Sequence, residues 1–410
     1  MAKSELIVGL DIGTTKICAV VGEPNDRGGL DIVGIGTSPS TGSRKGVVVN
    51  IEQTVQSIKK ALEEAELMAG CEIRSVYAGI AGSHIKGFNS HGVIAIKGNE
   101  VSPRDVERAL DAAKAVAIPQ DREVIHILSQ EYIVDDQRGI VDPLGMSGVR
   151  LEVKVHIVTG AVATAQNIVR SCHKSGLDVS DIVLEALASS KAVLTEEERE
   201  IGVALVDLGG GTSDIAIFAN DSIKHTGVLA LGGQNLTNDI AFGLRTPMAS
   251  AEQIKVRYGC ALADMVRADE FIEVPSVGGR EPRRVSRQIL AEICEPRMEE
   301  ILTLIDQELI RSGYKNMIGA GIVLTGGTAL IQGCQELGEQ IFDLPTRIGY
   351  PRNVDGLKEM VNSPKYATAV GLLRYGAEKE GADQGLRIRN DGNVFNSILG
   401  RMRKWFSEIS

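Results

Sequence analysis

This 410-residue chain has few aromatic side chains, no closely paired cysteines and no excess of positive charge. Aromatic residues make up 4% of it, which suits aliphatic α/β packing better than an aromatic-lined carbohydrate or nucleic-acid groove. The formal net charge of −10 argues against a general nucleic-acid-binding protein, because such proteins depend on attraction to phosphates. We therefore expect no nucleic-acid partner.

The six cysteines are scattered along the chain, and no two of them form a C-x-x-C pair. This spacing predicts reduced thiols in a cytoplasmic protein and argues against a disulfide framework or a zinc site. The N-terminus has no secretory signal, and no apolar run is long enough to span a bilayer. The length and a hydrophobic fraction of 43% predict two or three soluble domains.

Two common phosphate-binding strings, G-x-x-x-x-G-K-[ST] and G-x-G-x-x-G, are absent. The chain instead repeats another pattern, Asp11-Ile12-Gly13-Thr14-Thr15 and Asp207-Leu208-Gly209-Gly210-Gly211-Thr212, each between two apolar, strand-like runs. The Asp can hold a hydrated metal ion, and the glycines let backbone N–H groups approach phosphate oxygens. A hairpin with a Gly-rich turn would explain one copy. Two copies in the same order indicate two related half-structures that close on one nucleotide.

The order of predicted elements also repeats. Strands are expected over 6–10, 16–22, 31–36 and 72–80, with a helix over 51–68 before the last strand. After residue 200, strands over 201–208, 212–219 and 222–229 precede a helix from 233 and a strand over 321–325. This repetition indicates a duplicated fold unit. Residues 84–160 form an insertion, in which Ser102 and Pro103 begin a helix.

The chain ends in a different kind of sequence. Residues 376–393 are polar and contain glycine, which predicts a flexible linker. Residues 394–410 then place apolar side chains on one helical face: Phe395, Ile398, Leu399, Met402, Trp405, Phe406 and Ile409. Such a helix, about 24 Å long, is too short to cross a bilayer but can lie in an anionic membrane surface. Docking on the protein itself or on a partner is the alternative, although self-docking would not require the linker.

Further strings carry a resemblance to a known superfamily. Leu324-Thr325-Gly326-Gly327-Thr328 is similar to the adenosine motif of the actin, heat-shock chaperone and sugar kinase superfamily. The strings that begin at Glu185 and at Ala367 resemble its two connecting helices, and the repeated Asp-Gly-Thr turns resemble its phosphate motifs. The resemblance implies an α/β, two-lobed actin-like fold with duplicated ribonuclease-H-like core domains and an inserted subdomain.

Within that superfamily, the chain is similar to the FtsA family of bacterial cell-division proteins. The place of the insertion, the strings over 274–280 and 322–327, and the linker with its terminal amphipathic helix carry this similarity. It implies core domain 1A from 1–83, 161–195 and 357–375, inserted subdomain 1C from 84–160, core domain 2A from 196–230 and 301–356, and subdomain 2B from 231–300.

The resemblance also implies roles for single residues, with ATP and Mg²⁺ as cofactors. Asp11 and Asp207 would hold Mg²⁺ through its waters. The phosphate-binding groups would be Gly13, Thr14, Thr15, Gly209, Gly210, Gly211 and Thr212, with Lys16 either as a nearby cation or as a solvated strand lysine.

The nucleoside and the attacking water have their own candidate residues. Glu252 and Lys255 match ribose-binding positions, or they form an ordinary exposed ion pair. Gly326, Gly327 and Thr328 would face adenine. Glu185, together with Asp207, would position a water for hydrolysis; a simple helix-start carboxylate is its alternative. We expect at most a slow Mg²⁺-dependent ATPase.

The implied function is a scaffold. Members of the family polymerise on the cytoplasmic face of the inner membrane at the division site, tether FtsZ filaments there and recruit later division proteins, for which we assign residues 84–160. The FtsZ tail peptide would dock on a basic cluster that includes Arg284, Arg287 and Arg297, unless this is only a solvated helix face. The alternative is a pilus-assembly actin-like scaffold, which is expected to lack the terminal helix. A sugar kinase or chaperone is disfavoured, because no substrate base or substrate domain is in view.

Overall fold

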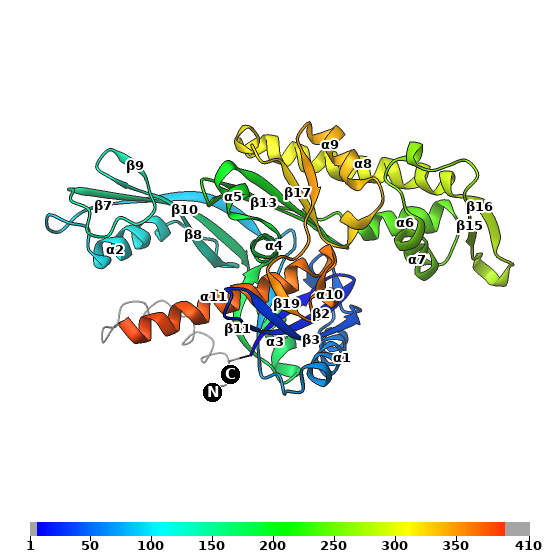
Figure 1. The fold of residues 1–410 in the computed structure, drawn as a ribbon, viewed down its shortest axis with the longest axis horizontal. Coiled ribbons are helices and arrows are strands. Elements are labelled where there is room, and N and C mark those ends of the chain that lie inside the picture. Colours follow the sequence, from blue (N-terminus) through cyan, green and yellow to red (C-terminus); the bar gives the residue numbers. More distant parts are fainter. Residues whose placement is uncertain (1–5, 390–410) are drawn as a thin grey trace.

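Two related sheets form the centres of two lobes in the computed structural model, which describes residues 6–389 (Figure 1). Five strands follow the same order in both sheets, and the first sheet has an additional edge strand. The first has the order β11-β6-β1-β2-β3-β19. Its strands are β1 (Ile7–Ile12), β2 (Lys16–Pro24), β3 (Leu30–Pro39), β6 (Ser75–Ile80), β11 (Asp178–Leu184) and β19 (Val354–Gly356). The second has the order β14-β13-β12-β17-β18. Its strands are β12 (Val203–Leu208), β13 (Ser213–Ala219), β14 (Ser222–Leu229), β17 (Ile322–Thr325) and β18 (Thr346–Ile348).

The pairing within these sheets confirms the predicted duplication. β1 pairs antiparallel with β2 and parallel with β6, and β12 pairs antiparallel with β13 and parallel with β17. Every residue of β1 and of β12 is buried, as expected for central strands covered on both faces. The predicted strands of both halves are present, with ends that differ by a few residues.

Helices α1 (Ile51–Ala69), α3 (Val162–Lys174), α4 (Glu185–Val193) and α11 (Ala367–Arg389) belong to the first lobe. The predicted helix over 51–68 is confirmed as α1, which begins where the Asn50 side chain accepts from the Gln53 N–H and ends at left-handed Gly70. Helices α4 and α11 cross closely: a Cβ added at Gly371 would lie 1.8 Å from the Ala188 carbonyl oxygen. Glycine at this crossing therefore sets the spacing of the two connecting helices.

The inserted subdomain is a sheet of order β7-β10-β8-β9 packed on α2 (Pro103–Lys114), and it forms the left end of the molecule in Figure 1. Its strands are β7 (Lys86–Ala95), β8 (Arg122–Val134), β9 (Gln137–Ile140) and β10 (Arg150–Ala161). Ser102 caps α2 and Pro103 is its first residue, as the sequence predicts. The structure adds a capping box between Ser102 and Asp105.

The inserted subdomain branches from the first lobe but packs against the edge strand β14 of the second. The Asn89 and Gln130 amides donate to the carbonyls of Lys224 and Ile223, at 3.2 and 2.7 Å. Buried His156 lies between Asn89 and the Thr226 hydroxyl, and burial lowers the pKa of its imidazole to about 4. These side chains satisfy carbonyl groups that an open sheet edge would leave exposed.

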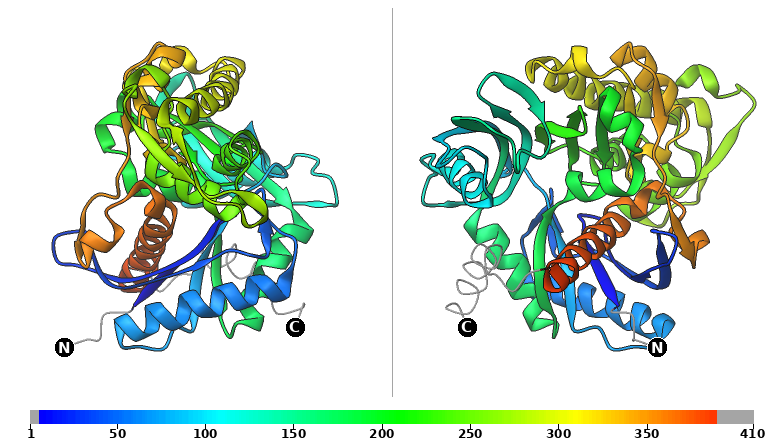
Figure 2. Two further views of the ribbon diagram at one scale, coloured as in Figure 1. Left: turned by 90° about the vertical axis from the view of Figure 1, so that its right-hand side faces the viewer. Right: turned by 60° about the vertical axis from the view of Figure 1, so that its left-hand side comes forward.

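The far end of the second lobe is mainly helical (Figures 1 and 2). It contains α6 (Gly233–Gly243), α7 (Met248–Tyr258), α8 (Arg287–Arg311) and the hairpin of β15 (Phe271–Val274) and β16 (Arg283–Ser286). The short helices α5 (Glu196–Ile201), α9 (Cys334–Phe342) and α10 (Lys358–Val361) complete the described helices, with several 3₁₀ turns. Helix α8 continues across residue 300, where the sequence analysis places a boundary between 2B and 2A, so both subdomains share it.

Two expected boundaries near the end of the chain differ from the structure. Strand β19 pairs with β3, so the chain rejoins the first sheet before residue 357. Helix α11 continues to Arg389, within the expected 376–393 linker, because Ala, Glu, Lys, Leu and Arg are good helix formers. The Tyr375 hydroxyl and the Lys379 ammonium both bind the Asp181 carboxylate and attach this helix to β11.

The predicted amphipathic helix over 394–410, with all of its apolar residues, lies outside the described residues. Among residues 6–389, no helix combines the length and the apolar character needed to cross a membrane.

Candidate functional site

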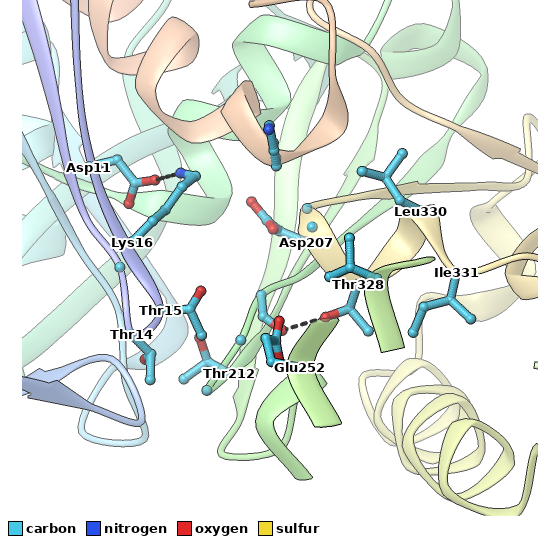
Figure 3. A pocket seen from close by; sticks show the side chains of 18 of the residues that line it. Asp11, Thr14, Thr15, Lys16, Asp207, Thr212, Glu252, Thr328, Leu330 and Ile331 are labelled. Carbon is cyan, nitrogen blue, oxygen red and sulfur yellow. Dashed lines mark hydrogen bonds and ion pairs between the residues drawn. The ribbon is translucent and has the colours of Figure 1, made fainter. Parts of the chain in front are cut away.

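A cleft between the two lobes collects all of the residues predicted for the nucleotide and Mg²⁺ site (Figure 3). Its volume is about 410 Å³, within the range of small-molecule and cofactor pockets. The predicted residues that line it are Asp11, Gly13, Thr14, Thr15, Lys16, Glu185, Asp207, Gly209, Gly210, Gly211, Thr212, Glu252, Lys255, Gly326, Gly327 and Thr328. Residues almost 200 positions apart in the sequence thus meet at one site.

The first Gly/Thr turn joins β1 to β2 and holds an ion pair. Asp11 is nearly buried at the end of β1, and Lys16 begins β2, with 2.8 Å between the Lys16 Nζ and Asp11 Oδ2 atoms. Burial lowers the pKa of Lys16, but attraction to Asp11 outweighs it, so this pKa lies above its ordinary value. Lys16 is therefore a charged side chain of the cleft, bound to the carboxylate that the sequence analysis assigns to Mg²⁺.

The second turn joins β12 to β13 and places Asp207 opposite Asp214 in the strand pair. Two hydroxyls from the connecting helices hold Asp207 Oδ2: Ser189 Oγ of α4 at 2.6 Å and Thr368 Oγ1 of α11 at 3.1 Å. Burial raises the pKa of Asp207, while the Ser189 hydrogen bond opposes this increase. The connecting helices thus orient this carboxylate from below the cleft.

The two turns touch each other directly. A Cβ added at Gly210 would lie 2.4 Å from Thr15 Cγ2, and one added at Gly211 would lie 2.4 Å from Thr14 Oγ1. Both distances are far below an ordinary carbon contact, so only glycine fits in the second turn with the lobes in this arrangement. Backbone N–H groups of both turns therefore lie at the same end of the cleft.

Glu185, the first residue of α4, lies at this end of the cleft with Asp11 and Asp207, and the buried Asp214 is close enough to act on its charge. Burial, followed by repulsion from Asp11, Asp214 and Asp207, raises the pKa of Glu185 well above its usual range. Burial and then Asp207 raise the pKa of Asp214 to about 7. The Oδ1 atom of Asp214 is buried without a hydrogen-bond partner. Such a crowd of carboxylates is stabilised by a cation or by protons.

Bound Mg²⁺ fits this donor set. Mg²⁺ prefers carboxylate oxygens, keeps several waters and shares its coordination with nucleotide phosphates. Within the described part of the chain, no three His, Cys, Asp or Glu side chains form a ready-made metal cage. Asp11 and Asp207 would thus hold the ion together with waters and phosphate oxygens, as the sequence analysis expects.

The opposite end of the cleft has the features of a nucleoside pocket. Glu252 and Lys255 of α7 form an (i, i+3) ion pair at 2.7 Å, and both line the cleft. Lys255 is buried, so this is not the ordinary exposed pair that was the alternative. Thr328 Oγ1 donates to the Gly209 carbonyl at 2.8 Å, which ties the adenosine motif to the second phosphate turn.

Sequence reasoning missed several residues of this cleft. Val256, Leu330 and Ile331 give it an apolar wall, and no periodic pattern distinguishes them from core residues. Ser363 and Lys365 precede α11 and also line the cleft. Asp214 is buried and does not line the cleft, but it could have been found as a neighbour of the site, because it follows the second Gly/Thr turn and faces Asp207 across an antiparallel pair.

The three arginines proposed to bind the FtsZ tail differ in whether their guanidinium groups are already paired within the protein. Arg287 binds Glu270 at 2.6 Å, and Arg297 binds Asp239 and Glu300, so both charges are paired within the protein. Exposed Arg284 instead stacks on the Phe271 ring, 4.2 Å from its centroid. Among these three, only Arg284 has a guanidinium without an ion pair to any residue of 6–389, and it lies beside an aromatic ring that is also half exposed.

Comparison with known proteins adds two family matches. Residues 204–371 match the family "Cell division protein FtsA", and residues 82–159 match "SHS2 domain inserted in FTSA". Among solved structures, the PilM-PilN type IV pilus biogenesis complex aligns at TM-score 0.64, with 16% identity over 90% of this chain and 98% of that one. MreB5 of Spiroplasma citri bound to ADP aligns at TM-score 0.54, with 16% identity over 93% and 98%. These structures confirm the actin-like fold.

Relatives that align over nearly the whole of both chains are also named cell division protein FtsA. The cell division protein FtsA of Pseudomonas aeruginosa is 55% identical over 407 residues, 98% of this chain and 97% of its own length. That of Escherichia coli K12 is 46% identical over 413 residues, 99% and 97% of the two chains. The pilus alternative is not favoured, since the pilus protein shares only the fold. The chain is a member of the FtsA family of cell-division proteins, with an actin-like fold and an inserted SHS2 subdomain.

Proposed function

We propose that the protein binds ATP and Mg²⁺ in the inter-lobe cleft and polymerises in a nucleotide-dependent way. The observation that carries this proposal is the meeting of two Gly/Thr turns, each preceded by a buried Asp, at one end of the cleft. The ADP and AMPPNP complexes of MreB5, which shares the fold, support it. Nucleotide at this position would contact both lobes and stabilise their closed arrangement.

The filament is proposed to lie on the cytoplasmic face of the inner membrane and to tether FtsZ. The support comes from the family and from the amphipathic sequence over 394–410. One amphipathic segment is a weak, reversible anchor, whereas a filament presents many at once. Polymerisation and attachment would therefore strengthen each other, and the inserted subdomain would be free to recruit later division proteins.

Electron microscopy on an anionic lipid monolayer tests both parts together. The full chain is expected to form filaments with ATP and Mg²⁺, and few without nucleotide. A full-length Trp405→Asp/Phe406→Asp variant should lose the lipid-bound filaments but bind nucleotide normally, whereas the matched Ser407→Asp variant should keep them. Filaments on lipid from the first variant would refute the anchor, and equal assembly without nucleotide would refute the ATP switch.

Liposome flotation gives a second test of the anchor. A chain that ends at Arg389, the last described residue of α11, should remain at the bottom of the gradient while the full chain floats. Undiminished flotation of the shortened chain would place the membrane contact elsewhere.

For the FtsZ contact, we propose that the acidic tail peptide docks over Arg284 and Phe271. An exposed guanidinium beside a half-exposed aromatic ring matches a peptide that carries both carboxylates and apolar side chains. Arg287 and Arg297 would then support the site through their internal ion pairs, without donating to the peptide themselves.

A further inference from the structure

A short hairpin of the first lobe reaches both phosphate turns. It consists of β4 (Ser43–Arg44) and β5 (Val47–Val48), joined by the two-residue turn Lys45–Gly46. Both turn residues have positive φ, 51° for Lys45 and 74° for Gly46, as two-residue hairpins of the tight, primed type require. A lysine in this conformation is unusual, because the side chain disfavours it.

The backbone of this turn contacts one phosphate turn from each lobe. The Gly46 N–H donates to Thr14 Oγ1 at 3.0 Å in the first turn, and Gly46 itself lines the cleft. A Cβ added at Gly211, in the second turn, would lie 2.9 Å from Lys45 Cα. Lys45 is thus at the phosphate end of the cleft, next to the place where the two lobes meet.

The charges in the cleft leave a role for another cation. Lys16 is paired with Asp11, and Lys255 is paired with Glu252. Lys365 also lines the cleft, beside Gly327, and lies over the Tyr366 ring, which the Lys16 ammonium approaches as well. Lys45 is exposed and forms no ion pair with any residue between 6 and 389. Its four-carbon stem can move the ammonium toward an anion without movement of the backbone.

We propose that Lys45 is a further nucleotide-binding residue, which recognises the terminal phosphate of a nucleoside triphosphate and so distinguishes it from the diphosphate. This inference rests on the proposed nucleotide site. ATP and ADP differ only in that phosphate, so a cation located where the two turns meet adds binding energy to ATP alone. The turn itself, hydrogen-bonded to Thr14 and in contact with Gly211, holds the lysine at this position.

Equilibrium binding of a non-hydrolysable ATP analogue and of ADP to the full chain tests this role. Lys45→Asn removes the charge and tolerates positive φ, whereas Lys45→Arg keeps the charge. We expect Lys45→Asn to weaken the ATP analogue about 10-fold and to change ADP binding less than about 2-fold, because a charge-assisted hydrogen bond is lost only with ATP. Lys45→Arg should retain the wild-type preference.

Arg44→Asn is the matched control, because Arg44 is the adjacent exposed cation and likewise has no ion pair within the described part of the chain. It should bind both nucleotides as the wild type does. Thermal unfolding without nucleotide should be alike in all variants, which excludes a folding defect. An unchanged ATP preference in Lys45→Asn, or an equal loss of both nucleotides, would overturn the role of Lys45. A wild-type chain that binds neither nucleotide would instead refute the proposed function.

Discussion

The Ser189 hydroxyl donates to the Asp207 carboxylate across 2.6 Å, so a connecting helix orients the metal-binding candidate of the second lobe. Ser189→Ala would remove this donor from a nearly buried carboxylate, which costs about 1–3 kcal/mol. It should also raise the pKa of Asp207 further. When the pH is lowered, the variant should therefore lose Mg²⁺-dependent nucleotide binding at a higher pH than the wild type does. Titration of nucleotide affinity against pH measures this shift. Ser190→Ala is the control, since Ser190 Oγ binds only the Leu187 carbonyl.

Gly210→Ala should prevent the present contact of the two lobes. The added methyl group would meet Thr15, and overpacking of this kind costs about 1–3 kcal/mol. Thr15→Ala should restore much of that stability in the double variant, because it removes the two atoms nearest to the new methyl group. Denaturant unfolding of the wild type, the two single variants and the double variant gives the coupling free energy between positions 210 and 15. Gly381→Ala on α11 should be harmless, since its added Cβ would meet nothing within 4 Å among the described residues beyond its own helix. Additive effects of the substitutions at 210 and 15 would contradict the contact.

The buried carboxylates predict how stability varies with pH in the absence of nucleotide. Burial and Asp207 raise the pKa of Asp214 from 3.8 to about 7. The folded protein therefore holds a proton that the unfolded chain releases, and the free energy of unfolding falls as pH rises between these values. The slope for one such group is at most about 1.4 kcal/mol per pH unit.

Asp214→Asn should flatten that decline and leave a smaller one from Glu185, whose pKa is raised in the same direction. Urea unfolding between pH 4.5 and 8 measures both slopes. Asp26→Asn, at an exposed carboxylate, should keep the wild-type slope. Identical slopes in all three proteins would show that Asp214 is ionised in the folded state throughout.

Glu185→Gln separates nucleotide binding from hydrolysis. The amide keeps the shape of the side chain but cannot accept a proton, so phosphate release from ATP should slow about 100-fold. Removal of a carboxyl group that Asp11, Asp207 and Asp214 repel should leave ATP affinity equal or slightly higher. Single-turnover experiments measure the rate of ATP hydrolysis, and equilibrium binding measures the ATP affinity. Unchanged hydrolysis would leave Glu185 as a helix-start carboxylate.

Charge reversal distinguishes the proposed FtsZ contact from structural arginines. Arg284→Glu should weaken binding of the FtsZ tail peptide at least about 5-fold and leave the melting temperature unchanged, because the Arg284 side chain is exposed and lies over the Phe271 ring without an ion pair to any described residue. Arg287→Glu would instead face Glu270 and lower the melting temperature. Peptide binding followed by fluorescence anisotropy, beside thermal unfolding, tests both. Equal affinity in Arg284→Glu and wild type would move the peptide to another surface.

Site residues could be predicted from local sequence where the whole motif lies within a few residues. Asp11, Asp207 and their Gly/Thr turns are recognisable from the strand that precedes them and the turn that follows. Partners distant in the sequence were not predictable in this way. Arg297 resembles a solvated helix residue until the fold brings Asp239 to it, and nothing in the sequence near Lys45 indicates that Gly211 lies beside it.

The start of the expected linker shows a different limit. Its polar, Gly-containing composition suggested a flexible segment, but helix propensity and the contacts of Tyr375 and Lys379 with Asp181 continue α11 to Arg389. Composition alone does not report such tertiary contacts, and here they extend the helix past the predicted boundary at 375.

Helix α11 therefore has a mechanical consequence. It begins at Ala367, beside the Thr368 hydroxyl that binds Asp207, and its 23 residues extend about 34 Å to Arg389. A small change of tilt at the cleft becomes a larger sideways displacement at the far end, as with a lever arm. A single continuous helix thus connects the nucleotide site to the residues that follow Arg389.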